Sequence, residues 1–288
     1  MKFLANDPRV HETLCQWAGA VSKRLVTSKF FFWRYGPTEQ KSVSGLLRGL
    51  LYEMCADDVE LTKLVFPSCW GRRISEADLR LRDDDIRAAF EYLCTNEEIS
   101  RKYRVCLFID GLDEFSSEEM ALWKVAKMMR SWTQQAVDRT NTNGLIKLCV
   151  SSREDDTVMS VFEKSNQIRL QDITEADISI IVNDTLLGNE HFQELRRSDP
   201  HGCGQVLKSI LVGAEGVFLR VSLLLNLLED ELPTVASASA PQNIIRTTPL
   251  EVEDFLGKIL DTMRKHYRRG VYFLFAVALR MLGPSPRR

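Results

Sequence analysis

Residues 104–114 read RVCLFIDGLDE, and the pattern within them indicates the fold class of the chain. A continuous apolar run from Val105 to Ile109 is followed by three carboxylates within five positions. A short apolar run of this kind predicts a strand that is buried on both faces of a parallel sheet. Ligands of parallel α/β sheets bind outside the carboxyl ends of the strands. The string therefore predicts a buried strand and a functional site at its end.

The carboxylates at this strand end have the residue types that nucleotide chemistry needs. Asp110 can hold Mg²⁺ beside nucleotide phosphates, either directly or through water. Asp113 or Glu114, a few residues later, can orient or deprotonate an attacking water. This is the arrangement of a Walker B motif. The alternative is an ordinary strand-to-helix turn in which the acids act as caps.

A second apolar strand, predicted over residues 145–150, ends in Ser151, Ser152 and Arg153. If this strand lies beside the first, Ser152 and Arg153 can contact a bound nucleotide, and Arg153 can reach its γ-phosphate. The alternative is that Ser152 caps the next helix and Arg153 is solvated. A phosphate cradle of the form G-x-x-x-x-G-K-[ST] does not occur in the chain. Carboxylates without such a cradle are expected to hold Mg-ATP poorly.

Strand and helix patterns alternate in the first part of the chain, and only helical patterns follow. This order predicts an α/β domain with a parallel sheet and then an all-α region. The expected strands cover residues 25–33, 105–109, 145–150 and 167–170, and Thr174 with Asp177 is expected to start the first helix of the second region. The predicted boundaries give an α/β domain at 1–172, a helical subdomain at 173–232, a linker or inserted loop at 233–249 and a further helical region at 250–288.

The composition of the chain limits the cellular compartment and the classes of binding partner that are expected for it. The chain has 288 residues, and its 38 basic and 40 acidic side chains give a net charge of −2, which argues against a general nucleic-acid binder. Its 7 cysteines include no C-x-x-C pair, so a zinc site or a disulfide framework is not expected and a reducing cytoplasm is the predicted location. The longest uncharged apolar run, Val271–Leu279, is far shorter than the roughly 20 residues of a membrane span, so a buried helix is expected there.

Several strings of the chain, in their order and spacing, are typical of one family. They are Met1–Leu4 with Asp7-Pro8, Phe30–Arg34, Gln40–Ser42, Leu46–Glu53, Phe108–Glu114, Cys149–Arg153, Leu170–Thr174, Ala214–Leu219 and Phe255–Arg268. Together they resemble the NACHT ATPase module of fungal NOD-like receptor proteins, in the group related to the nephrocystin-3-like N-terminal domain. These proteins are STAND-class signalling NTPases.

The resemblance implies an ATP- or ADP-dependent molecular switch that uses Mg²⁺. It implies that Asp110 binds the metal, that Asp113 or Glu114 positions the hydrolytic water, and that Arg153 senses the γ-phosphate. The family's first strand and P-loop would lie immediately before Met1, so the resemblance implies a P-loop-NTPase-like sheet without that strand, and a weak or inactive ATPase. It also implies that residues 250–288 begin a winged-helix region. Arg220 stands where relatives usually have an aromatic residue.

Three other hypotheses remain open at this stage. The first is that the gene has been read from too late a start, so that the true product carries a P-loop and switches on nucleotide. The second is that the chain is a non-catalytic interaction module that forms homo- or hetero-oligomers with full-length NACHT relatives through an uncovered sheet edge or through its helices. A carboxylate-metal nuclease using Asp110, Asp113 and Glu114 is disfavoured, because no further acid or histidine is placed at another strand end.

Overall fold

The computed structural model describes residues 1–20, 22–67, 81–116, 120–135, 144–234, 237–249, 252–262 and 265–282. Within these ranges the chain forms two compact units, residues 1–167 and residues 168–282. The division falls after Gln167, five residues before the boundary that the sequence predicts at residue 172. The first unit contains a parallel sheet with helices and the second contains helices, so the predicted fold class of α/β followed by all-α is confirmed.

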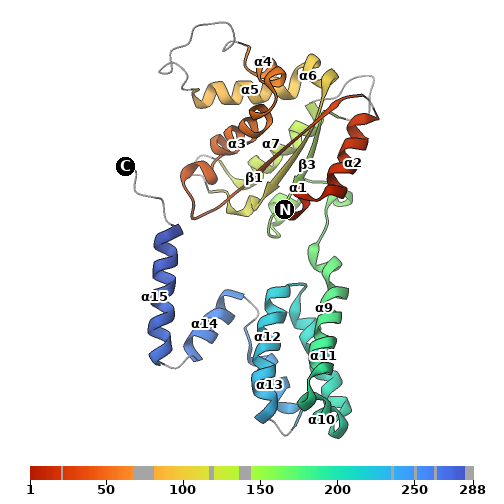
Figure 1. The fold of residues 1–288 in the computed structure, drawn as a ribbon, viewed down its shortest axis with the longest axis vertical. Coiled ribbons are helices and arrows are strands. Elements are labelled where there is room, and N and C mark those ends of the chain that lie inside the picture. The colour runs from red at the N-terminus through yellow and green to blue at the C-terminus, as the bar shows by residue number, and fades with distance from the viewer. Residues whose placement is uncertain are drawn as a thin grey trace. The chain divides into compact units, whose positions relative to one another are not determined.

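The sheet of the first unit has three parallel strands in the order β1-β2-β3 (Figure 1). They are β1 (Arg24–Phe31), β2 (Tyr103–Asp110) and β3 (Ile146–Val150). The central strand β2 is buried from its first residue to Ile109, as its continuous apolar run predicts. The apolar end of residues 25–33 predicts a strand that is buried on both faces, but the outer strand β1 is mostly half-exposed, so that prediction is wrong. Its position at an edge of the sheet explains the difference.

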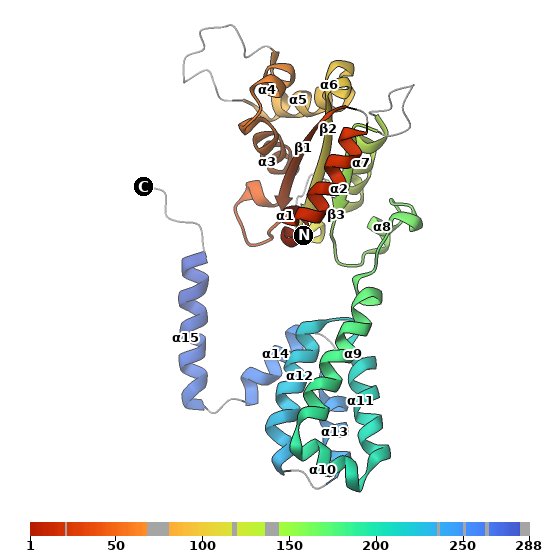
Figure 2. The same cartoon turned by 45° about the vertical axis from the view of Figure 1, so that its right-hand side comes forward.

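Alternate residues of the strands enter two separate cores, one on each face of the sheet. On one face, Val105, Leu107 and Ile109 pack with α3 (Val43–Ala56), α5 (Asp83–Thr95) and α7 (Leu122–Gln135). On the other face, Cys106 and Phe108 pack with Leu14 and with the helices α1 (Lys2–Asn6) and α2 (Pro8–Gly19) (Figure 2). Both faces of the central strand are therefore covered, which is the arrangement that parallel strands require.

Local sequence signals explain where these helices begin. Ser42 caps α3 by accepting a hydrogen bond from the Gly45 N–H at 3.2 Å, and Asp7 caps α2 by accepting one from the Arg9 N–H at 2.8 Å. The helical spacing of Leu46, Leu47, Leu50 and Leu51 predicts an apolar face, and the burial of all four residues in α3 confirms it. The sequence also predicts a capping box at Ser75 and Asp78 and a polar loop at 138–144, and the capping box and most of the loop lie outside the described residues. The other short helices are α4 (Val59–Val65), α6 (Glu97–Lys102), α8 (Asp156–Met159), η1 (Thr38–Gln40), η4 (Leu112–Glu114) and η5 (Lys164–Asn166).

The second unit is built on a core of helices that includes Ile178, Phe192, Val206 and Leu224. Its elements are α9 (Leu170–Gly188), α10 (Glu190–Ser198), α11 (Pro200–Ala214), α12 (Phe218–Glu231), η6 (Leu232–Thr234), α13 (Ser239–Thr247), α14 (Val252–Thr262) and α15 (Lys265–Leu282). Figure 1 shows α9, α11, α12 and α13 lying side by side.

Three expectations for this region are wrong. Residues 167–170 form no strand, and α9 starts at Leu170 instead of near Thr174. The Thr174 hydroxyl bonds back to the Leu170 carbonyl at 3.0 Å, which suits a residue inside a helix better than a cap. The stretch predicted as a linker at 233–249 contains α13, because Ile244 and Ile245 pack against the helical core and Pro241 sits within the first turn, where proline is tolerated.

The apolar run Val271–Leu279 is helical, within α15, but it is not buried among the described residues. Phe273 is 69% exposed and Leu279 is 70% exposed. The expected burial of this run is therefore wrong for the part of the chain that the structure describes. Among the described residues, no helix has both the length and the apolar character needed to cross a bilayer.

Candidate functional site

The carboxyl ends of β2 and β3 bring Asp110 and Ser151 together. The strand register pairs Ile109 with Val150, and the Ser151 N–H donates to the Ile109 carbonyl at 2.9 Å. The next residue on each strand is therefore adjacent, and the Ser151 hydroxyl donates a hydrogen bond to Oδ1 of Asp110. The same hydroxyl oxygen accepts from the Gly111 N–H at 3.1 Å. Ser151 thus fixes both the half-buried carboxylate and the start of the turn that follows it.

Gly111 redirects the chain after the strand. Its φ of 68° lies in the left-handed region, which a residue with a side chain rarely adopts. The conformation and not lack of space favours glycine, because a Cβ here would lie 3.4 Å from its nearest neighbour, the Phe32 carbonyl oxygen, which is an ordinary contact. Leu112 then donates its N–H to the Ser151 carbonyl at 2.9 Å, and η4 begins. The turn places the two later acids at the same edge of the sheet as Asp110.

Asp113 is held by Arg153 from the end of β3. The Arg153 N–H donates to Oδ1 of Asp113 at 3.0 Å, and its Nε lies 3.6 Å from Oδ2. The Arg153 side chain is 81% exposed, whereas that of Asp113 is 19% exposed. The ends of β2 and β3 therefore lie next to each other, as the sequence predicts. In this arrangement the guanidinium interacts with a carboxylate of the protein itself.

Glu114 is held by the segment that follows β1. The Arg34 N–H donates to Oε2 of Glu114 at 2.9 Å, and Nη2 of Arg34 donates to the Asp113 carbonyl at 2.9 Å. The Phe32 N–H reaches the Asp110 carbonyl at 3.0 Å. All three strands therefore contribute contacts to the turn between Asp110 and Glu114.

Sequence reasoning chose one residue that takes no part in these contacts and missed two that do. Ser152 is exposed, and its side chain makes no hydrogen bond within the described residues. It does not cap the next helix either, because Asp155 accepts from the Thr157 and Val158 N–H groups at the start of α8. Ser151 and Arg34 were missed. The parallel register identifies Ser151, but no sequence signal distinguishes Arg34 from other arginines that follow a strand.

The three acids share one turn but do not converge on one point. Each is bound by a different partner, and no group of three or more His, Cys, Asp or Glu side chains suited to a metal ion occurs in the described ranges. Mg²⁺ is commonly bound through one or two carboxylates, with waters and phosphate oxygens completing its shell. A single half-buried carboxylate that is oriented by a hydroxyl, as Asp110 is by Ser151, fits that mode of binding.

The start of the chain lies close to this edge of the sheet. The Sγ of Cys149, on β3, is 3.8 Å from the Sδ of Met1. Burial raises the pKa of the Cys149 thiol, the positive amino terminus opposes the rise, and the Asp110 carboxylate adds to it. Cys149 is thus a protonated, half-buried thiol beside the candidate site and not an activated nucleophile.

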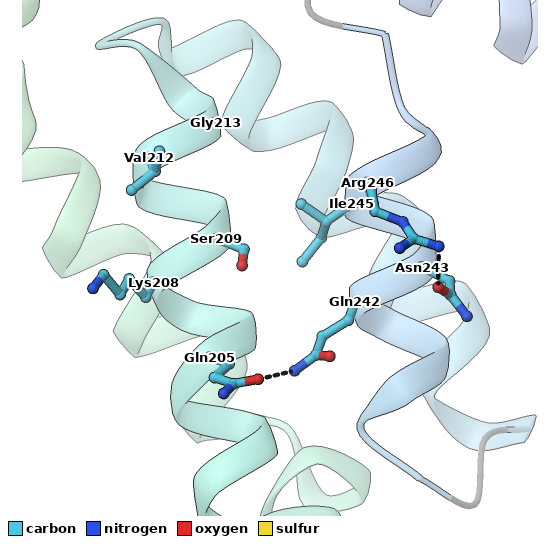
Figure 3. Close-up of a pocket in the computed structure, with 9 residues that line it drawn as sticks. All are labelled: Gln205, Lys208, Ser209, Val212, Gly213, Gln242, Asn243, Ile245 and Arg246. Atoms are coloured by element: carbon cyan, nitrogen blue, oxygen red, sulfur yellow. Dashed lines mark hydrogen bonds between the residues drawn. The ribbon is translucent and has the colours of Figure 1, made fainter.

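A separate open groove of about 530 Å³ lies within the helical unit, between α11 and α13 (Figure 3). Gln205 and Gln242 bond across it at 3.0 Å, and Arg246 bonds to Asn243 at 3.3 Å. Figure 3 shows Lys208 extending away from α13, so the two cations do not converge. Two pairs of its polar side chains therefore bond to each other, and the groove brings together no carboxylates of the kind found at the strand ends.

A known protein family has a model that matches the part of the chain that contains this site. Residues 11–153 match the family model described as "Nephrocystin 3, N-terminal". The match begins in α2 and ends at Arg153, so it includes all three strands and the contacts at their carboxyl ends. It supports the resemblance to the nephrocystin-3-like N-terminal group. Neither the curated proteins nor the solved structures contain a significant match to the chain.

Proposed function

We propose that residues 1–167 supply the metal- and water-binding side of a nucleotide site in a NACHT-type signalling NTPase. The observation that carries this proposal is the contact between Asp110 and Ser151 at the shared carboxyl edge of two parallel strands. This edge is where parallel α/β sheets bind ligands. The match to the nephrocystin-3 N-terminal model over residues 11–153 supports the same assignment.

We assign a role to each side chain at this edge of the sheet from the contacts that it makes. Asp110, oriented by Ser151, would hold Mg²⁺ beside the phosphates of ATP or ADP. Asp113 or Glu114, fixed by Arg153 and Arg34 respectively, would position the attacking water. Arg153 is exposed and would exchange its ion pair with Asp113 for a contact with the γ-phosphate. Ser152, exposed beside it, would donate its hydroxyl to the phosphates.

This side of the site is expected to bind nucleotide weakly. The backbone N–H groups and the lysine of a phosphate cradle supply much of the affinity for phosphates, and the printed sequence contains no G-x-x-x-x-G-K-[ST] string. We therefore assign the chain millimolar affinity for Mg-ATP and no measurable ATP turnover by itself. Nucleotide-dependent switching would need a cradle supplied by further residues.

The test is a titration of the labelled 288-residue chain with Mg-ATP, followed through backbone amide resonances. Shifts are expected at Gly111, Ser151 and Arg153 in the millimolar range, and Asp110→Asn should remove them. Asp84→Asn is the matched control, because it makes the same charge change at an exposed acid of α5. Micromolar binding that depends on Mg²⁺ would contradict the weak half-site, and no shift at these amides at saturating Mg-ATP would contradict the nucleotide role.

One observation favours a second function, that of a non-catalytic interaction module. The bonds from the Val105 N–H to the Leu145 carbonyl and from the Ser151 N–H to the Ile109 carbonyl fix the ladder between β2 and β3. In a parallel ladder, the N–H and C=O groups of Ile146, Leu148 and Val150 must then point away from β2. Within the described residues no strand pairs with this edge. The second proposal is that an extended strand of a full-length NACHT relative, or of a second copy, pairs with it.

Proline substitution separates this function from the first. Leu148→Pro removes an N–H that points away from β2, so it should abolish association through the edge and keep the ladder intact. Leu148→Ala controls for the loss of the side chain and should still associate. The measurement is light scattering after size exclusion, with and without a NACHT relative. A strictly monomeric wild-type chain that captures no relative would count against the module.

A further inference from the structure

The helix α15 exposes a continuous apolar surface. The uncharged run Val271–Leu279 lies within this helix, and its large side chains are exposed in the part of the chain that the structure describes. Leu274 is 66% exposed and Phe275 is 52% exposed, and Phe273 and Leu279 are still more open. Contiguous apolar patches of this kind commonly mark a site that binds a protein or a membrane.

The exposed apolar side chains are not confined to one side of α15. Successive residues of an α-helix project about 100° apart around its axis, so Phe273, Leu274 and Phe275 point in three different directions. All three are exposed. A single partner helix covers a stripe along one side of its neighbour and would leave at least one of these side chains in water. The surface therefore suits an environment that surrounds the helix on several sides.

The charged side chains of α15 are all positive. Its sequence, KHYRRGVYFLFAVALRML, contains four Lys or Arg residues and no Asp or Glu. Arg269 and Arg280 are exposed and lie on either side of the apolar run, about three turns apart and therefore on the same side of the helix. Arg268 is directed to α14, where its Nη1 lies 4.0 Å from Oδ1 of Asp261. The chain as a whole has a net charge of −2, so α15 is a local concentration of positive charge.

This charge distinguishes between the possible occupants of the surface. A second copy of α15 packed antiparallel would bring Arg269 close to Arg280 of the other copy, and like charges at short distance repel each other. An anionic lipid surface complements both cations. Its acyl chains can also cover apolar side chains that point in several directions. Charge and shape therefore both favour lipid over a second copy.

The length of the apolar run determines how the helix would lie. At 1.5 Å per residue, Val271–Leu279 is roughly 14 Å long, whereas the hydrocarbon core of a bilayer is roughly 30 Å thick. A helix of this length fits along the interface, where apolar side chains reach about 5–10 Å into the boundary between headgroups and acyl chains. Arginine side chains at both ends of the run can extend to the headgroups while their stems stay among the acyl chains.

We propose that α15 binds the surface of a membrane that contains anionic lipids. Val271–Leu279 inserts at the boundary of the acyl chains, and Arg269 and Arg280 contact the lipid headgroups. Anionic lipids are concentrated in the cytoplasmic leaflet, which agrees with the cytoplasmic location that the cysteines predict. The proposal concerns the helical unit alone and does not depend on the nucleotide site at the strand ends.

The test is flotation of the full chain with two kinds of vesicle. One kind is pure phosphatidylcholine, and the other contains roughly one-fifth phosphatidylserine, which supplies the anionic surface. Wild type is expected to float with the anionic vesicles and not with the neutral ones, and added salt should weaken the binding. No binding to anionic vesicles, or equal binding to both kinds, would overturn the proposal.

Leu274→Glu tests the apolar contact. A charge placed among the acyl chains should weaken vesicle binding by about tenfold or more. The side chain is exposed, so the variant should keep the helix content of wild type by circular dichroism. Ile180→Glu is the matched control, because it makes the same charge change at an aliphatic side chain of α9 that is 58% exposed. Equal binding by the two variants would show that α15 is not the contact.

Replacement of both Arg269 and Arg280 by Gln tests the charge. Binding to anionic vesicles should fall by about fivefold for each cation removed. Replacement of both Arg196 and Arg197 by Gln is the matched control, since it removes two exposed cations from α10 and should leave binding unchanged. Equal losses in the two double variants would attribute binding to the net charge of the chain and overturn the role of α15.

Light scattering without vesicles tests a second copy as the occupant. The oligomeric state should be the same in wild type and in Leu274→Glu, because the surface is expected to contact lipid and not protein. Oligomers of wild type that are lost in Leu274→Glu would assign the surface to a second copy and would overturn the lipid proposal.

Discussion

Ser151, directly after β3, donates its hydroxyl hydrogen bond to the carboxylate of Asp110 at the end of β2, and it accepts one from the Gly111 N–H. One side chain therefore links the two strands at the point where both end. The neighbouring Ser152 has the same hydroxyl and makes no such bond within the described residues. This difference between adjacent serines gives the first prediction its internal control.

Ser151→Ala should destabilise the first unit. It removes the donor to Asp110 and the acceptor of the Gly111 N–H, and a hydrogen bond of this kind contributes about 1 kcal/mol to the free energy of unfolding. Urea unfolding monitored by circular dichroism measures the loss. Ser152→Ala should stay within about 0.5 kcal/mol of wild type, as exposed substitutions usually do. Equal effects of the two variants would contradict the contact between Ser151 and Asp110.

Asp7 gives a prediction that depends on pH. Hydrogen bonds from the Arg9 side chain, and then from the Arg9 backbone, lower the pKa of Asp7 from 3.8 to about 2. A carboxyl group whose pKa is lower in the folded state stabilises the protein above its unfolded-state pKa, and the stabilisation is lost as the pH falls through the folded-state value. Asp7→Asn should therefore lower the thermal midpoint at neutral pH.

The difference between wild type and Asp7→Asn should shrink as the pH falls from about 4 to about 2. Thermal unfolding across this range measures it, with Asp84→Asn on α5 as a control for the general loss of an acid. A difference between the two proteins that is constant from pH 7 to pH 2 would show that the Asp7 carboxylate is not the source of the stabilisation.

The cysteines should divide by reactivity. Burial raises the pKa of Cys94 and of Cys106 to about 12, with nearby Glu91 and Cys149 adding to the effect, whereas Cys15 is exposed on α2. Alkylation proceeds through the thiolate and needs access. At pH 8, iodoacetamide should modify Cys15 in the native protein and should modify Cys94 and Cys106 only after unfolding. Peptide mapping by mass spectrometry measures the modification of each cysteine. Modification of Cys106 in the native protein at the same rate as Cys15 would contradict the burial of Cys106 in the sheet.

Much of the sheet could be predicted from sequence because local pattern and tertiary position agree there. The run Val105 to Ile109 is apolar at every position, and it is the central strand with both faces covered. The strand at residues 25–33 reads the same way, yet its place at the edge leaves it half-exposed. The pattern of apolar residues shows whether a segment is apolar, but it does not show which strands lie beside it. The order of the strands, and therefore the exposure of β1, could not be predicted from this pattern.

The candidate site divides in the same way. Asp110 was identified because it follows a strand, and the three acids do lie at one turn. Arg34 could not be identified, since its contacts to Asp113 and Glu114 depend on how the segment after β1 folds beside β2. The start of α9 was misplaced because Thr174 resembles a cap. Its hydroxyl instead lies 3.0 Å from both the Leu170 carbonyl and the Gly216 carbonyl, and the second of these acceptors, 42 residues away, leaves no local signal.

That contact makes Gly216 the most informative glycine of the helical unit. A Cβ on Gly216 would lie 2.2 Å from the Cβ of Gln171, and its φ of 75° disfavours any residue with a side chain. Gly216→Ala should therefore destabilise the helical unit by about 2 kcal/mol or more, since the left-handed conformation alone costs roughly 1–2 kcal/mol. Gly204, exposed within α11, has nothing within 4 Å of the corresponding position. Gly204→Ala should stabilise the unit by up to about 1 kcal/mol through helix propensity.

Urea unfolding of the two variants measures both changes in the free energy of unfolding. Because these changes are expected to have opposite signs, a general effect of adding a methyl group cannot explain both. A stable Gly216→Ala variant would mean that the turn between α11 and α12 does not pack against α9 as it does here.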